Sequence, residues 1–165
     1  MNRKEINSIN ILVISPFQFR QTLIDALVKE NIVGDCDYKL TISSCESVEE
    51  IGSFHQDSEE SPKKYLFDYI VLVVDAILRF GLQKAEKEIS LIPNYYFTTR
   101  RTFFISSDTL NLDYGFYELY KKYKCPAVVG DILEPKGCAS IARRALKLIE
   151  FSGGMNSGLP FLGLD

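Results

Sequence analysis

Residues 9–24 read INILVISPFQFRQTLI, an apolar strand that runs into a short turn and then into a helix. Nucleotide-binding α/β proteins place a phosphate loop, G-x-x-x-x-G-K-[ST], between such a strand and such a helix. The corresponding frame here, residues 15–22, reads SPFQFRQT. Its last hydroxyl is present as Thr22, whereas both glycines and the lysine are missing. The stretch predicts the fold of a nucleotide-binding protein without the loop that binds the nucleotide.

The rest of the chain predicts a doubly wound sheet. Runs such as YIVLVV and TFFI lack the polar alternation of half-exposed strands, so they are typical of parallel strands covered on both faces. Helical patterns lie between the runs, which predicts a three-layer α/β/α fold with a mainly parallel five-stranded sheet in the order 2-1-3-4-5. This is a Ras-like or P-loop-like topology that lacks nucleotide motifs. The predicted strands are 9–15, 38–43, 68–75, 102–107 and 126–130.

The predicted helices cover 20–31, 78–92, 113–123 and about 137–151, with a short helical turn within 47–54. Residues 55–64, HQDSEESPKK, are polar and charged, and we expect a mobile loop there. The predicted domain is 1–152, and 153–165 is an irregular tail that is apolar at its end. Tyr95, Tyr96 and Phe97 form an aromatic cluster for which a place in the core is favoured over an exposed contact.

Composition narrows the function classes. The net charge of −3 argues against nucleic-acid binding as the main activity, and the clusters at 121–124 and 143–144 are interpreted as solvated helix faces. Four separated cysteines without a C-x-x-C pair favour reduced thiols rather than a zinc site or a disulfide framework. With no apolar run long enough for a membrane span and no signal-peptide pattern, we expect a soluble intracellular domain without a membrane partner.

The altered loop removes most of what holds a triphosphate. A lysine about 4 Å from a phosphate oxygen contributes roughly 4 kcal/mol at an effective dielectric constant near 20, and Gln21 replaces it here. Pro16 has no backbone N–H to donate, and Arg20 stands where the second glycine leaves room for the phosphates. Arg20 carries a charge that pairs with phosphate, yet it lacks the surrounding cradle of amides. An ordinary helix start is the favoured interpretation.

The other strand ends carry little chemistry. Of the guanine-reading pattern N-K-x-D only Asp108 is present, and the single histidine, His55, lies in the expected loop. We therefore predict no catalytic residues, cofactor or metal. One alternative stays open: a degenerate switch or receiver-like domain with weak nucleotide or phosphoryl binding through Arg20, Thr22, Asp75 or Asp108. Asp75 ends the third predicted strand, where a receiver has its phosphate acceptor, although capping of the next helix is favoured for it.

A more specific resemblance rests on four stretches: FDYIVLVVD (67–75) with the following LRFGLQKAEKEIS (78–90), YYFTTRRTFFIS (95–106), CPAVVGDILEPKG (125–137), and a terminal ARRALKLIEFSGG with an apolar tail. In order and spacing, residues 9–163 resemble the centromere protein M family. The resemblance implies a small-GTPase-like fold without nucleotide binding or switch regions. It also implies a non-catalytic subunit of the inner kinetochore, in the nucleus at the centromere. The implied partners are centromere protein I, a helical-repeat protein, and centromere proteins H and K.

The tail is the candidate partner contact. Its apolar side chains are too few to form a core of their own and too apolar to face water without cost. A tail that folds back on its own domain is the equal alternative. Phosphorylation at Ser58 or Ser61, in the expected loop, is left open by the sequence. The candidate partner-binding residues are Leu159, Phe161, Leu162 and Leu164.

Overall fold

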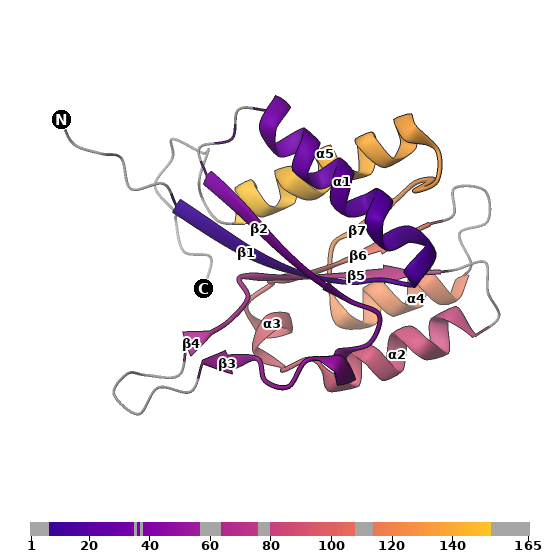
Figure 1. The fold of residues 1–165 in the computed structure, drawn as a ribbon. Coiled ribbons are helices and arrows are strands. Elements are labelled where there is room, and N and C mark those ends of the chain that lie inside the picture. Colours follow the sequence, from indigo (N-terminus) through magenta and orange to yellow (C-terminus); the bar gives the residue numbers. More distant parts are fainter. Residues whose placement is uncertain are drawn as a thin grey trace.

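The computed structural model of the chain describes residues 7–34, 36, 38–56, 64–75, 80–107 and 114–152. Thirteen elements follow one another along the described chain (Figure 1). They are β1 (Asn7–Ile14), α1 (Phe17–Val33), β2 (Tyr38–Cys45), the 3-10 turn η1 (Val48–Glu50), β3 (His55–Gln56), β4 (Lys64–Tyr65), β5 (Tyr69–Val74), α2 (Gly81–Leu91), α3 (Tyr95–Thr98), β6 (Thr102–Ser106), α4 (Tyr114–Tyr123), β7 (Ala127–Val129) and α5 (Pro135–Ser152).

The main sheet has the strand order β2-β1-β5-β6-β7, and each neighbouring pair is parallel. Counted among these five strands alone, the order is 2-1-3-4-5, so the predicted fold class and order are confirmed. The labels run to β7 because a short antiparallel pair, β3–β4, lies between β2 and β5 in the chain. Flavodoxin-type sheets share the order 2-1-3-4-5, so strand order alone does not separate a GTPase-like from a receiver-like fold.

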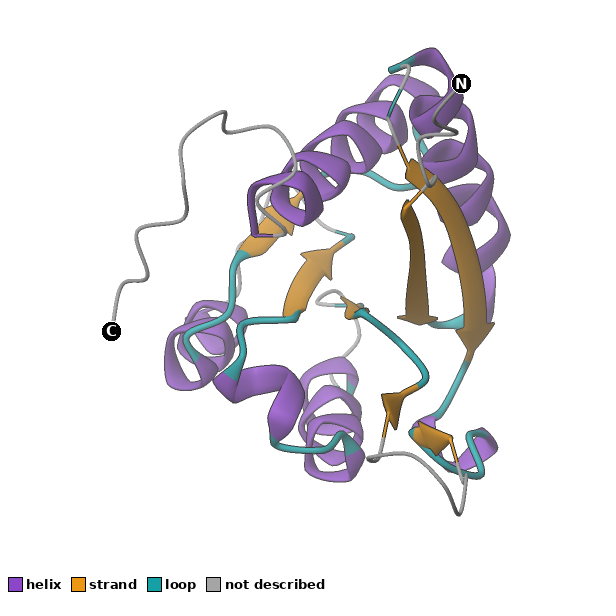
Figure 2. Cartoon of the chain, turned by 90° about the vertical axis from the view of Figure 1, so that its left-hand side faces the viewer, coloured by secondary structure: helices purple, strands orange, loops and turns teal. Residues whose placement is uncertain are grey.

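Helices α1 and α5 cover one face of the sheet, and α2, α3 and α4 cover the other (Figure 1). Figure 2 shows the sheet between these two layers. Strand β5 explains the unbroken apolar run, because Val71 and Val73 pack toward α1 and α5 while Leu72 and Val74 pack toward α2 and α4. All six residues of this strand are buried, as a central parallel strand requires.

Helix α1 begins at Phe17, three residues before the predicted start at Arg20. Pro16 stands at the N-cap with φ −51° and ψ 144°, which leads the chain directly from the strand into the helix. The first helix and its preceding strand are therefore joined by two residues only, 15 and 16. The helix ends at Val33, where the Gly34 N–H donates to the Glu30 carbonyl oxygen at 2.9 Å.

The prediction of a mobile loop over residues 55–64 is wrong at both ends of this range. His55 pairs with Tyr65 and Gln56 with Lys64 as the β3–β4 hairpin. Aromatic packing holds the hairpin in place. The Tyr65 ring stacks on the Tyr95 ring of α3, with the centroids 3.8 Å apart and an interplanar angle of 4°. The centroid of the His55 ring lies 4.4 Å from that of Tyr65. These side chains lie some 30 residues apart in the chain, so local polarity does not reveal the pairing. Ser58 and Ser61 lie outside the described residues.

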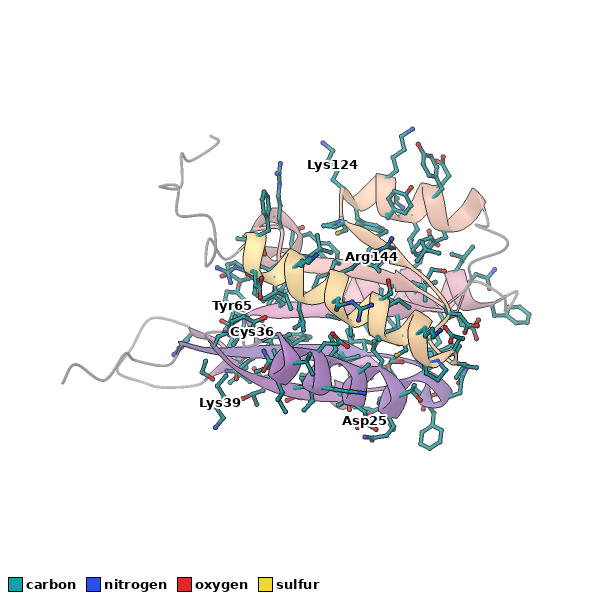
Figure 3. All side chains as sticks on the ribbon, turned by 90° about the horizontal axis from the view of Figure 1, so that it is seen from above. Asp25, Cys36, Lys39, Tyr65, Lys124 and Arg144 are labelled. Atoms are coloured by element: carbon teal, nitrogen blue, oxygen red, sulfur yellow. The ribbon has the colours of Figure 1, made fainter. Side chains whose placement is uncertain are left out.

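The prediction that the aromatic cluster lies in the core is confirmed for Tyr96, which is fully buried. Tyr95 and Phe97 are only half-buried. The Tyr96 hydroxyl donates to the Phe67 carbonyl oxygen at 3.0 Å. The short helix α3 that carries these rings was not predicted. Residues 121, 122, 124, 143 and 144 are exposed, as expected of solvated helix faces, and Figure 3 shows Arg144 on the outer side of α5.

Candidate functional site

A cavity of about 450 Å³ opens at the carboxyl ends of β1 and β5, against the first turns of α2. The chain leaves β1 toward the α1 face and leaves β5 toward the α2 face, which makes this place the topological switch point of the sheet. Ligands of doubly wound proteins bind at this point. The lining residues are Ile14, Ser15, Pro16, Gln18, Glu46, Leu72, Val73, Asp75, Phe80, Gly81, Lys84, Ala85 and Glu88.

The connection from β1 to α1 leaves no loop for a phosphate. Of the eight residues in the frame 15–22, residues 17–22 are already helical. The Ser15 N–H donates to the Cys45 carbonyl oxygen at 3.0 Å, and Pro16 has no N–H. A phosphate loop uses successive free backbone N–H groups to surround the phosphates, and this two-residue connection does not provide them.

Two residues of the alternative nucleotide site, Arg20 and Thr22, do not line the cavity. The Arg20 guanidinium lies over the Phe17 ring, 5.4 Å from its centroid, and Thr22 is exposed within α1 instead of opening it. Gln21, at the position of the missing lysine, donates to Asp25 Oδ1 at 2.7 Å. Asp108 lies outside the described residues. The structure thus does not bring Arg20 and Thr22 to the cavity.

Asp75 does line the cavity and is 6% exposed. Gln18 Nε2 donates to Asp75 Oδ2 at 3.2 Å, which joins the end of β5 to the first turn of α1. The expectation that Asp75 caps the next helix is wrong, because α2 begins at Gly81 with Phe80 at the N-cap and no side-chain cap. The Asp75 backbone lies against this helix start, because a Cβ on Gly81 would clash with the Asp75 carbonyl oxygen.

Sequence reasoning missed Glu88, the most buried acidic residue of the cavity at 3% exposure. Its Oε2 accepts a hydrogen bond of 2.6 Å from the backbone N–H of Val48, the first residue of η1. Helix α2 is thereby joined to the turn that follows β2. The available signal was the position of Glu88 between Ala85 and Ile89 on the apolar stripe of α2, where a carboxylate needs a partner.

Two ion pairs join the same elements. Lys84 Nζ lies 3.6 Å from Glu46 Oε1 at the cavity, and Lys87 Nζ lies 3.1 Å from Glu49 Oε1 outside its lining. Among the described residues of the lining, the charged side chains are therefore three acids and one lysine, and that lysine is already paired. Such a lining repels the charges of a phosphate group instead of neutralising them.

The end of β6 places two hydroxyls near the end of β5. Ser106 is the register partner of Val74, so Ser107 and Asp75 are the next residues on the two strands. Both serine side chains are buried, and their hydroxyl oxygens have no hydrogen-bond partner within the described ranges. An acid and a hydroxyl at adjacent strand ends match part of a receiver site. The acid pair that a receiver has after its first strand is replaced by Ser15 and Pro16.

Buried thiols carry no nucleophile for this site. Burial raises the pKa of Cys36 and Cys138 above the usual thiol range, and it raises the pKa of Cys45 and of Cys125 to about 12. All four cysteines are free. Over the part of the chain that the structure describes, no three His, Cys, Asp or Glu side chains are grouped to hold a metal ion, and no helix is long and apolar enough to cross a membrane.

Comparison with known proteins gives one family. Residues 4–165, nearly the whole chain, match the family described as Centromere protein M (CENP-M). A search of curated proteins gave no match. The chain therefore belongs to the centromere protein M family, and it is a protein of the centromere and kinetochore, and so of the nucleus.

Proposed function

We propose that this chain is a non-catalytic pseudo-GTPase and a structural subunit of the constitutive inner kinetochore complex. In this role it braces the helical-repeat centromere protein I, together with centromere proteins H and K. The observation that carries the proposal is the two-residue connection between β1 and α1, which replaces a phosphate loop at the switch point of the sheet. A domain of this size can stiffen a repeat protein by burying apolar surface against it.

Electrostatics support the absence of nucleotide binding. A loop lysine contributes about 4 kcal/mol to a phosphate contact at an effective dielectric constant near 20, which is about a thousandfold in affinity. In its place the cavity presents Asp75 and Glu88, both buried, and Glu46 with its paired Lys84. Removal of the attraction and addition of repulsion act in the same direction, so we expect no measurable affinity for a nucleoside triphosphate.

Contacts within the protein also support a scaffold rather than a switch. In GTPases the switch segments are ordered by the γ-phosphate and its magnesium ion and are released on hydrolysis. Here α2 is joined to η1 and its flanking residues by the buried Glu88–Val48 hydrogen bond and by the ion pairs of Lys84 and Lys87. These contacts need no ligand, so the surface that a partner meets stays the same whatever nucleotide is present.

Calorimetry with GTP, GDP and ATP in the presence of magnesium tests the pseudo-GTPase assignment. We expect no binding heat for any of the three, with an active small GTPase titrated in the same buffer as the positive control. Micromolar binding of any nucleotide would refute the assignment.

The tail from residue 153 is proposed as a separate partner-binding segment that follows the domain 1–152. Its residues Leu159, Phe161, Leu162 and Leu164 would bury their side chains against centromere protein I. The test compares the full chain with a chain ending at residue 152 and with a full chain in which these four residues are changed to Asp. We expect at least about a tenfold loss of affinity in both, as for the loss of apolar anchors at an interface. Unchanged affinity for centromere protein I in both variants would refute the proposed contact.

A receiver-like role is the second candidate, and it is favoured by one observation, the adjacent strand-end positions of Asp75 and Ser107. Incubation with acetyl phosphate and magnesium, followed by intact-mass analysis and by borohydride trapping, distinguishes the two candidates. The scaffold proposal predicts no phosphoryl transfer. A phosphoryl group on Asp75 that is lost in Asp75→Asn would favour the receiver-like role.

A further inference from the structure

The main sheet ends at β7, which has one neighbour, β6, among the described strands. The Pro126 carbonyl oxygen accepts a hydrogen bond of 2.9 Å from the Phe104 N–H of β6, and the Gly130 N–H donates to a carbonyl oxygen of β6 at 3.2 Å. Alternate residues of a parallel strand direct their N–H and C=O groups to opposite sides. The N–H and C=O groups of Ala127 and Val129 are therefore directed away from β6, along the edge of the sheet.

A groove of about 410 Å³ lies between this edge strand and the C-terminal half of α5, and we call it the edge groove. Its largest apolar side chain, Phe151, is 85% exposed, more than any other large apolar residue that the structure describes. An exposed aromatic ring beside an unpaired strand edge is a surface that a partner can cover. The edge groove is lined by Ala127 and Val128 of β7 and by Arg144, Lys147, Leu148 and Phe151 of α5.

The charge of the edge groove is positive. Its charged side chains among the described residues are Arg144 and Lys147. Both are exposed, and neither forms an ion pair with a described residue. The neighbouring Arg143 differs, because it lies 3.5 Å from Glu30 and does not line the groove. Two unpaired cations beside an apolar surface are complementary to an occupant that carries both carboxylates and an apolar side chain.

We infer that the edge groove binds an extended acidic segment of a partner protein, which adds to the sheet as a strand beside β7. The main chain of the segment pairs with the backbone groups of Ala127 and Val129. Side chains at alternate positions of the segment lie on one face, where an apolar residue meets Phe151 and acidic residues meet the two cations. Nucleic acid lacks the alternating N–H and C=O groups that this edge pairs with. The inference goes beyond the proposed function, because it uses neither the switch-point cavity nor the tail.

The probe is the capped pentapeptide Glu-Thr-Val-Thr-Glu, whose glutamates and valine share one face of a strand in either chain direction. Binding to the full-length ¹⁵N-labelled chain is followed by amide chemical shifts. We expect saturable shifts at Ala127 and Val129, because their N–H groups gain an acceptor. The same peptide with lysines in place of the glutamates should bind at least about fivefold more weakly. The glutamate peptide with N-methyl groups on its inner amides should not bind, because it cannot donate to the strand edge.

Reversal of one charge in the groove distinguishes loss of binding from a folding defect. Arg144→Glu should weaken binding of the glutamate peptide at least about fivefold and strengthen binding of the lysine peptide, whereas a folding defect weakens both. Arg143→Glu is the matched control, because Arg143 is the adjacent residue of α5 and does not line the groove. At physiological salt it should leave both affinities within about twofold.

Absence of shifts at Ala127 and Val129 with about 5 mM glutamate peptide would overturn the inference, as would equal binding of the lysine peptide or of the N-methyl peptide. Three other occupants are tested in the same spectra, and each would overturn the assignment to a partner strand. The tail is the occupant if replacing its four proposed contact residues with serine shifts these amides before peptide is added. A second copy is the occupant if the shifts depend on protein concentration, and nucleic acid is the occupant if a short DNA duplex binds more tightly than the peptide. The nucleotide titration tests the proposed function separately, so a failure here rejects this inference alone.

Discussion

Replacement of Glu88 by alanine should destabilise the folded chain by about 2 kcal/mol. The Glu88 carboxylate accepts the Val48 N–H at 2.6 Å in a buried position, and Val48 itself is 4% exposed. Hydrogen bonds to charged groups contribute about 1.5–3 kcal/mol, and a buried donor left without a partner keeps its desolvation cost. Glu88→Gln keeps an acceptor oxygen and should cost only about 1 kcal/mol.

Urea unfolding followed by far-UV circular dichroism measures this change. With a slope of about 2 kcal/mol per M, a loss of about 2 kcal/mol lowers the midpoint by about 1 M. Hydrogen exchange provides a local reading, because the Val48 amide should lose protection in Glu88→Ala. Glu86→Ala is the matched control, since Glu86 lies on the exposed side of α2 and its removal should change stability by no more than about 0.5 kcal/mol. Equal midpoints for the two alanine variants would refute the claim that Glu88 fixes α2 to η1.

Three further changes have defined outcomes. In the folded state burial raises the pKa of the Cys45 and Cys125 thiols from 9.0 to about 12, so both are neutral. Their contribution to stability is therefore complete below pH 9 and is lost as the pH rises toward 12. The urea midpoint should fall between about pH 7 and pH 11, and a midpoint that does not change with pH would contradict the burial of these thiols. Gly81→Ala places a Cβ against the backbone carbonyl oxygen of Asp75 and should destabilise the fold by about 1–3 kcal/mol. Gly52→Ala meets nothing within 4 Å and should be near neutral in the same unfolding assay. Tyr96→Phe leaves the carbonyl that its hydroxyl bonds without a donor and should cost about 1–2 kcal/mol, and an unchanged thermal midpoint would count against that bond.

Much of the fold was predictable because a strand that is buried on both faces has a continuous apolar sequence. The run YIVLVV of β5 has no polar residue, since both faces of this strand are covered by helices. The hairpin β3–β4 has no such sequence. It is held by the stack of Tyr65 on Tyr95. The polar stretch 55–64 contains no pattern that predicts a contact with a helix 30 residues later in the chain.

For the candidate site, the sequence predicted the missing phosphate-loop residues but not the roles of the acidic residues that line the cavity. The missing glycines and lysine in 15–22 were evident, and the early start of α1 at Phe17 adds the geometric reason. The role of Asp75 was misjudged, because helix capping was inferred from chain position and α2 begins six residues later. Glu88 was overlooked because its partner, the Val48 N–H, lies 40 residues away.

The central claim is that this chain braces its kinetochore partners without reading a nucleotide. Its most direct test is the affinity of the chain for recombinant centromere protein I in complex with centromere proteins H and K. The measurement is made in nucleotide-free buffer, with GDP and magnesium, and with a non-hydrolysable GTP analogue and magnesium. We predict one dissociation constant under all three conditions. A change of tenfold or more between conditions, or no complex in any of them, would contradict the account.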